Sequence, residues 1–197
     1  MNELAYSGEQ DYFRPNFFAN TPDILHEYLQ HGGPAAFEAR LVLAATLSPS
    51  YGIYSGFEHF ENVPVREGSE EYLDSEKYEV KKRALDGPLL PFIQKINQAR
   101  RDNPALHVLS NVHFLDTYND ALIAYAKVAR GNTVIVAANI DPHNPQEGVV
   151  LVPAHLGLPP AFTVEDLMTG AHYDWRIGAN YVRLDPHGEQ THILKVL

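Results

Sequence analysis

The sequence has no cysteine, one tryptophan and two methionines among its 197 residues. The absence of cysteine excludes disulfides and thiolate metal sites, and it fits a reducing, cytoplasmic compartment. Basic residues are also scarce, because 15 Lys+Arg stand against 25 Asp+Glu and give a formal net charge of −10. A net acidic chain is a poor general binder of nucleic acid or anionic membrane, so neither is an expected partner.

Long apolar segments are missing as well. The longest mainly apolar run, Leu41–Leu47, is far shorter than the ~20 residues that span a bilayer. The opening residues, Met1–Gly8, carry neither a basic region nor an apolar core, so we expect no signal peptide. With 45% hydrophobic and 20% charged residues, the composition is that of a globular chain. The length allows one large domain or two small ones, whereas a complete (β/α)8 barrel alone needs roughly 250 residues.

The first half of the sequence predicts a mixed α/β arrangement. Residues 14–20 and 51–54 are short apolar stretches compatible with buried strands. Residues 35–47 lie between them and are rich in helix formers, with Phe37 and Leu41 on one stripe. Strand, helix and strand in this order are typical of a parallel βαβ unit.

A second, shorter helix is predicted just after the first strand. Thr21 can cap a helix, Pro22 suits a first helical position, and Asp23 favours the first turn. We therefore expect a helix that starts at Thr21 and extends over residues 24–29.

Residues 58–86 form a long polar connection with little periodicity, and residues 88–101 predict a second clear helix that Asn103-Pro104 ends. A loop this long in a compact domain is usually functional or disordered. The remainder of the chain predicts an antiparallel sandwich of short strands. These strands are expected at residues 112–117, 121–128, 133–140, 148–152, 162–166, 181–184 and 192–196.

Two groups of residues are candidates for chemistry. Asp23 follows a predicted parallel strand, where barrels build active sites, although an Asp in a first helical turn more often only contacts backbone N–H groups. Lys77 and Tyr78 can hold a phosphate with a point charge and a hydroxyl, although a solvated surface loop is the simpler interpretation. The ten histidines show no metal-binding spacing, and there is no glycine-rich phosphate loop. We therefore expect no metal and no cofactor.

Several stretches resemble the α-amylase-type barrels of glycoside hydrolase family thirteen. Residues 41–58, an apolar helix followed by a tyrosine-rich strand and a Gly-x-Glu, resemble the last helix and eighth strand of that barrel. Residues 20–23, Asn-Thr-Pro-Asp, lie where the family has the Asn-His-Asp of its seventh strand. Residues 92–106 resemble the helix that leads to the family's C-terminal β-domain.

One branch of the family matches better than general amylases. Residues 12–29 and 68–78 resemble the α-1,4-glucan:maltose-1-phosphate maltosyltransferases, and the resemblance extends to residues 180–186 near the chain end. It implies that residues 1–106 are the C-terminal part of a (β/α)8 TIM barrel, with the donor-binding loop. Residues 107–197 would be an antiparallel β-sandwich domain.

The resemblance also implies an activity and residue roles. The branch transfers maltosyl from α-maltose 1-phosphate to the non-reducing end of an α-1,4-glucan by a retaining double displacement, releasing phosphate. By position, Asp23 corresponds to the carboxylate that stabilises the transition state, and Lys77 and Tyr78 correspond to the pair that binds the donor. Pro22 replaces the family's His, and Glu58, Glu67 and Asp74 are weaker candidates. A homodimer is the assembly considered for the full-length enzyme.

The nucleophile and the acid/base of this family lie on the fourth and fifth barrel strands, which these residues do not include. We therefore expect a C-terminal fragment that is inactive alone. The alternative is a non-catalytic module in which residues 108–197 bind glucan or serve as an accessory domain. Trp175, Tyr173 and Tyr181 would stack on sugar rings in that case, or else pack in the core.

Overall fold

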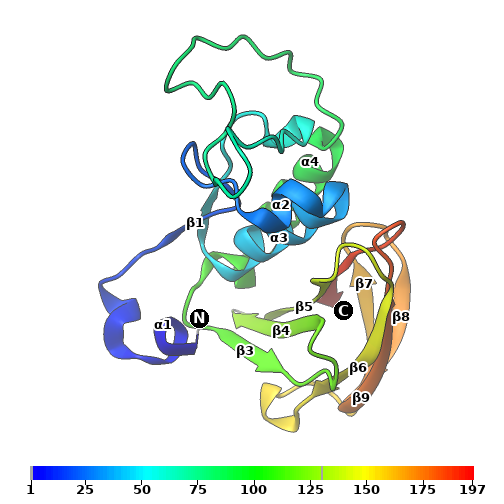
Figure 1. The fold of residues 1–197 in the computed structure, drawn as a ribbon. Coiled ribbons are helices and arrows are strands. Elements are labelled where there is room, and N and C mark those ends of the chain that lie inside the picture. The colour runs from blue at the N-terminus through cyan, green and yellow to red at the C-terminus, as the bar shows by residue number, and fades with distance from the viewer. Residues whose placement is uncertain (1, 130) are drawn as a thin grey trace.

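A computed structural model describes residues 2–129 and 131–197. Helices α2 (Glu27–His31), α3 (Gly33–Leu47) and α4 (Leu90–Asp102) lie together on one side of a large β-sheet, and a long loop extends from them away from that sheet (Figure 1). The short helix α1 (Asn2–Tyr6) lies apart from this group. No helix in the described part of the chain is long and apolar enough to cross a membrane.

The N-terminal half contains one parallel strand pair and the helices that surround it. The β1–β2 pairing is parallel, with Asn16 opposite Ser50 and Phe18 opposite Gly52, so the predicted parallel strand–helix–strand unit is present. The elements are α1 (Asn2–Tyr6), η1 (Gly8–Asp11), β1 (Asn16–Phe18), α2 (Glu27–His31), α3 (Gly33–Leu47), β2 (Ser50–Gly52), η2 (Phe57–His59), α4 (Leu90–Asp102) and η3 (Pro104–His107).

Helix α3 is the central helix of this half. Pro34 lies in its first turn, where a missing N–H is tolerated, and Ser48-Pro49 ends it. Apolar residues lie around most of its circumference and are buried, so α3 is covered by neighbours on several sides. It contacts both parallel strands, α4, and the strands β5 and β10 of the C-terminal half.

The predicted helix start at Thr21 is wrong. The backbone N–H of Thr21 donates to the Ile24 carbonyl (3.3 Å), and that of Ile24 donates to the Thr21 carbonyl (3.2 Å), which closes a tight turn. Helix α2 starts at Glu27, where the His26 Nδ1 accepts a hydrogen bond from the Tyr28 N–H (3.1 Å). Asp23 therefore lies in a turn, and the first-turn explanation of this carboxylate does not apply.

The C-terminal half is antiparallel, as expected. One sheet has the order β3-β4-β5-β10-β7-β8, and β6 pairs with β9 in a second, two-stranded sheet. Every predicted strand is present, and the structure adds one that the sequence analysis missed, β8. The strands are β3 (Val112–Leu115), β4 (Leu122–Ala129), β5 (Asn132–Asn139), β6 (Gln146–Val152), β7 (Ala161–Asp166), β8 (His172–Arg176), β9 (Gly178–Leu184) and β10 (Thr191–Val196), with the short helix η4 (Ala154–Leu156) after β6.

The six-stranded sheet is packed on both faces. On one face Ile135, Val164 and Trp175 pack against Val150 and Val182 of the β6–β9 sheet. On the other face, residues of β3, β4, β5 and β10 join the same core cluster as α3 and α4. Trp175 is 6% exposed, so the core-packing interpretation of this residue is the correct one.

The chain from Phe60 to Leu89 has no helix or strand. Its backbone contains an isolated antiparallel β-bridge between Pro64 and Tyr72. The predicted long polar loop is thus confirmed. Because β1–β2 is the one parallel pair among the described residues, the assignment of residues 1–106 to a TIM barrel remains a prediction.

Candidate functional site

The candidate site lies where the two parallel strands end. Both β1 and β2 run in the same direction, so the residues after Phe18 and Gly52 emerge at the same edge of the pair. In barrels built of parallel strands, active sites occupy this edge. Here the edge carries Asn20 and Asp23 after β1, and Tyr54 after β2.

Asn20 joins the two strand ends to the long loop. It is 2% exposed, its Oδ1 accepts from the Tyr54 N–H (2.8 Å), and its Nδ2 donates to the Tyr72 hydroxyl (2.6 Å). The Tyr54 and Tyr72 rings pack edge to face with centroids 5.4 Å apart. Burial raises the pKa of Tyr72 to about 12, so this hydroxyl stays neutral. The amide therefore fixes the middle of the loop to the strand ends.

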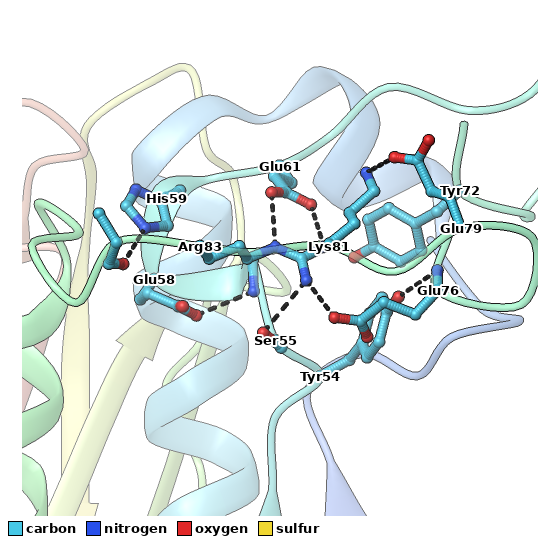
Figure 2. Close-up of polar contacts among 12 residues, drawn as sticks. Tyr54, Ser55, Glu58, His59, Glu61, Tyr72, Glu76, Glu79, Lys81 and Arg83 are labelled. Carbon is cyan, nitrogen blue, oxygen red and sulfur yellow. Dashed lines mark hydrogen bonds and ion pairs between the residues drawn. The ribbon is translucent and has the colours of Figure 1, made fainter. Parts of the chain in front are cut away.

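Arg83 holds the far part of the same loop (Figure 2). Its Nε and Nη2 donate to the two carboxylate oxygens of Glu61, each at 2.8 Å, which is the bidentate geometry that favours arginine. Its Nη1 donates to Glu76 (2.5 Å) and to the Ser55 hydroxyl (3.2 Å). The Arg83 side chain is 10% exposed, and its hydrogen bonds lower the pKa of the Glu61 carboxyl.

Besides its contact with Arg83, Glu76 is also held by Tyr54, which follows strand β2. Its backbone N–H donates to the Tyr54 hydroxyl (3.2 Å), so the segment that contains Lys77 and Tyr78 starts from a residue held at two points. Figure 2 shows Glu76 next to both the Arg83 guanidinium and the Tyr54 hydroxyl.

Lys77 then brings two carboxylates together. Its Nζ donates to Asp23 Oδ1 (2.7 Å) and to Glu71 Oε1 (2.9 Å), and the Tyr78 hydroxyl donates to the same Glu71 oxygen (2.8 Å). The hydrogen bonds to Asp23 and Glu71 raise the pKa of Lys77, and the bond from Lys77 lowers that of Glu71. The Lys77 ammonium also lies 5.7 Å from the centroid of the Tyr78 ring.

This cluster is open to solvent. The Asp23, Lys77 and Glu71 side chains are 66%, 42% and 31% exposed, so a ligand can reach all three. An anionic ligand can replace a carboxylate as the partner of Lys77, because an ammonium is a point charge with three freely oriented donors. A sugar hydroxyl can donate to Asp23. The arrangement thus suits a ligand with both phosphate and hydroxyl groups.

The structure brings together the three leading sequence candidates, Asp23, Lys77 and Tyr78, although they are separated by more than fifty positions along the chain. The weaker candidates lie elsewhere. Glu58 is 9% exposed and its Oε2 accepts from the Gly56 N–H (3.0 Å). Glu67 is exposed and lines a separate cavity with Glu27, His31 and their neighbours.

The third weaker candidate, Asp74, is also exposed, and it has a left-handed backbone with φ of 50°.

The sequence did not predict three further members of the site, Asn20, Glu71 and Arg83. A signal for Asn20 was available, because it is the first residue of the Asn-Thr-Pro-Asp segment. Glu71 and Arg83 are charged residues of a polar loop, and nothing in their spacing separates them from their neighbours.

Comparison with known proteins places these residues in a family context. Residues 114–196 match the family model described as "GLGE, C-terminal". The chain is 55% identical over 194 residues to α-1,4-glucan:maltose-1-phosphate maltosyltransferase 2 of Streptomyces coelicolor, covering 94% of this chain and 29% of that protein. It is 46% identical over 210 residues to the maltosyltransferase of Mycolicibacterium smegmatis, covering 98% of this chain and 30% of that protein. The chain therefore spans about a third of the length of these relatives.

Solved structures with a similar fold are α-amylases. An Anoxybacillus α-amylase matches with a TM-score of 0.67 at 16% identity, over 93% of this chain and 38% of that one. The Geobacillus thermoleovorans α-amylase solved with acarbose matches with a TM-score of 0.67 at 14% identity, over 96% of this chain and 41% of that one. These two show the fold alone. The curated relatives and the family model confirm that the chain resembles the C-terminal part of the α-1,4-glucan:maltose-1-phosphate maltosyltransferases.

Proposed function

We propose that this chain supplies one wall of a maltosyltransferase active site, with Asp23, Lys77 and Tyr78 facing the donor. The observation that carries the proposal is the 2.7 Å contact between Lys77 Nζ and Asp23 Oδ1, which puts a phosphate-binding cation beside a carboxylate at the strand ends. The high identity to named maltosyltransferases supports the same reaction.

The reaction would be a retaining double displacement on α-maltose 1-phosphate. A nucleophilic carboxylate forms a bond to the anomeric carbon as the bond from that carbon to the phosphate oxygen breaks, and a carboxylic acid protonates the departing phosphate. The 4-hydroxyl at the non-reducing end of an α-1,4-glucan then attacks the anomeric carbon, loses its proton to the same acid/base, and releases the nucleophile.

Each residue of the cluster has a distinct part in this scheme. Asp23 accepts hydrogen bonds from sugar hydroxyls and stabilises the positive charge that develops on the sugar ring in the transition state. Lys77 binds the donor phosphate with its ammonium, and Tyr78 donates its hydroxyl to a phosphate oxygen. For this to happen, the phosphate displaces Glu71 as the shared partner of Lys77 and Tyr78. Pro22 carries no ring nitrogen for the sugar, so the contacts around Asp23 differ from those of a histidine-bearing relative.

The proposal includes a division of the chain. Residues 1–106 would complete a (β/α)8 barrel, and residues 107–197 would form its C-terminal β-sandwich domain. The nucleophile and the acid/base would come from barrel strands outside these 197 residues. A purified polypeptide of these residues alone is then expected to release no phosphate from α-maltose 1-phosphate.

A chimera tests the roles directly. The C-terminal region of the Streptomyces coelicolor relative is replaced by this chain, and phosphate release is measured with maltoheptaose as the acceptor. Asp23→Asn is expected to lower kcat by about a hundredfold or more, because an electrostatic contact made in the transition state is lost. Lys77→Met is expected to raise the KM for α-maltose 1-phosphate.

Lys82→Met is the matched control, because Lys82 is an exposed lysine of the same loop. It should leave both constants unchanged. Full turnover by the Asp23→Asn chimera would contradict the role given to Asp23. Equal effects of Lys77→Met and Lys82→Met on KM would contradict the role given to Lys77.

A further inference from the structure

A second candidate site lies in the C-terminal half, on strands that the proposed reaction does not use. An open groove of about 680 Å³ follows β8 and β9, with Ala161 of β7 at its margin. This volume is in the range of small-molecule sites. Strand β8 is the outer strand of the six-stranded sheet, and β9 belongs to the other sheet (Figure 1). The groove is lined by residues of both strands and therefore lies where the two sheets meet.

An anchored aromatic ring forms one side of the groove. Tyr181 is 64% exposed, yet its hydroxyl donates to Glu147 Oε2 on the adjacent strand β6 (2.8 Å). This hydrogen bond raises the pKa of Tyr181 and keeps the phenol protonated. The ring is thus held at the surface in one orientation and can bind a flat, partly apolar ligand face with little loss of side-chain entropy.

Polar groups with unused hydrogen-bonding capacity form the opposite side. Asp174 Oδ1 accepts from the Thr163 hydroxyl (3.3 Å), and Arg176 Nε donates to the Ala179 carbonyl (3.4 Å). Within residues 2–129 and 131–197, no further partner occupies the second Asp174 oxygen or the terminal nitrogens of Arg176. A carboxylate oxygen and two guanidinium nitrogens are therefore directed to solvent beside the ring, where they can bind vicinal hydroxyls.

The floor of the groove is rigid. Asn180 is 7% exposed, and its Oδ1 accepts from the Arg176 N–H (2.9 Å). Its Nδ2 donates to the carbonyls of Arg176 (2.9 Å) and Gly178 (3.0 Å). Gly178 has φ of +95°, a conformation that a residue with a Cβ rarely adopts, so the corner between β8 and β9 is fixed by its sequence. Both sides of the groove keep their spacing without a ligand.

We propose that this groove binds a carbohydrate chain, and specifically an α-1,4-glucan. An exposed, fixed aromatic ring beside a carboxylate and a guanidinium matches a sugar, which has an apolar face and a rim of hydroxyls. The mixed charge of Asp174 and Arg176 does not suit a polyanion, and the polar rim does not suit an apolar helix. The choice of an α-1,4-linkage rests on the proposed function, since that glucan is the acceptor. Tethering the acceptor here would raise its concentration near the transfer site.

Binding is tested on the 197-residue chain, by its retardation in native gels that contain glycogen and by calorimetric titration with maltoheptaose. The unmodified chain is expected to bind both. Tyr181→Ala is expected to weaken binding by about tenfold or more, because the stacking ring is lost. Tyr181→Phe keeps the ring but loses the Glu147 contact, so it should retain most of the affinity. Asp174→Ala combined with Arg176→Ala should also weaken binding.

Tyr118→Asn is the control, because Tyr118 is 81% exposed but lies outside the groove, and asparagine tolerates its φ of 53°. Circular dichroism verifies that each variant is folded. Failure of the unmodified chain to bind either glucan would overturn the proposal, as would an equal loss in Tyr118→Asn and Tyr181→Ala. Equal binding of cello-oligosaccharides would overturn the α-1,4 assignment. Because the readout is binding, loss of transfer by the Asp23→Asn chimera leaves this result unaffected, and the two proposals fail separately.

Discussion

Replacing Lys127 with methionine should alter how the stability of the protein depends on pH. Lys127 lies on β4, is fully buried, and donates from Nζ to the Leu47 carbonyl at the end of α3 (3.1 Å). Burial lowers the pKa of the ammonium from its ordinary 10.5 to about 7, and the positive charge of Arg100 acts in the same direction. The folded state therefore releases a proton that the unfolded state still binds.

The sign and the size follow from this difference. A folded-state pKa below the unfolded-state pKa means that protonation favours unfolding, so the free energy of unfolding rises as pH increases from about 7 toward about 10.5. With about 1.4 kcal/mol for each pH unit across that window, the gain between about pH 7 and about pH 9 is roughly 2 kcal/mol. Lys127→Met removes this contribution and should flatten the profile by the same amount.

At about pH 7 the variant should also be more stable by roughly 1 to 3 kcal/mol. The buried charge costs about 4 kcal/mol there, whereas losing the hydrogen bond to the Leu47 carbonyl costs about 1 to 3 kcal/mol. Urea unfolding at the two pH values, followed by the fluorescence of Trp175, measures both effects. Lys82→Met, which removes an exposed lysine, should leave the slope unchanged. Parallel pH profiles for the unmodified chain and the Lys127→Met variant would refute the reasoning.

Other substitutions probe the loop and the contact between the two halves. Arg83→Gln should release the loop and accelerate chymotrypsin cleavage at Tyr78, which is 71% exposed; unchanged cleavage in a mass-spectrometric time course would contradict this role. Gly56→Ala should destabilise the chain by about 2 kcal/mol, because φ is +99° and the new Cβ would collide with the Glu61 carboxylate; thermal unfolding measures it. Tyr125→Phe should cost about 1 kcal/mol in urea unfolding, since it removes one buried hydroxyl from a hydrogen-bonded pair.

Much of the fold follows from local pattern. The strands of the C-terminal half are bounded by turn residues, and helix α4 has an apolar side and an Asn103-Pro104 end, so each was predictable from its own segment. Strand β8 was not, because three of its five residues are exposed and polar while Trp175 alone is fully buried. The start of α2 was mispredicted because Thr21 and Pro22 are equally suited to a tight turn, and tertiary hydrogen bonds decide between the two.

The candidate site was predictable in part. Asp23, Lys77 and Tyr78 carry the chemistry in their side chains and can be singled out by residue type. The contact between Asp23 and Lys77 depends on the path of a loop with almost no regular structure. That path is set by Arg83 and Asn20, whose hydrogen bonds join distant segments. No local pattern encodes such pairings.

The sheet with helices on one face and the β6–β9 ribbon on the other has a consequence for recombination between related genes. The Tyr125 hydroxyl on β4 is hydrogen-bonded to the Thr46 hydroxyl on α3, and Lys127 on the same strand donates to the Leu47 carbonyl at the end of α3. A recombination crossover near residue 106 would separate these partners, because α3 and β4 would then come from different parent proteins. We therefore expect natural exchange of the C-terminal half to succeed where the incoming β4 carries tyrosine at position 125 and lysine at position 127. The two halves should accordingly be inherited together.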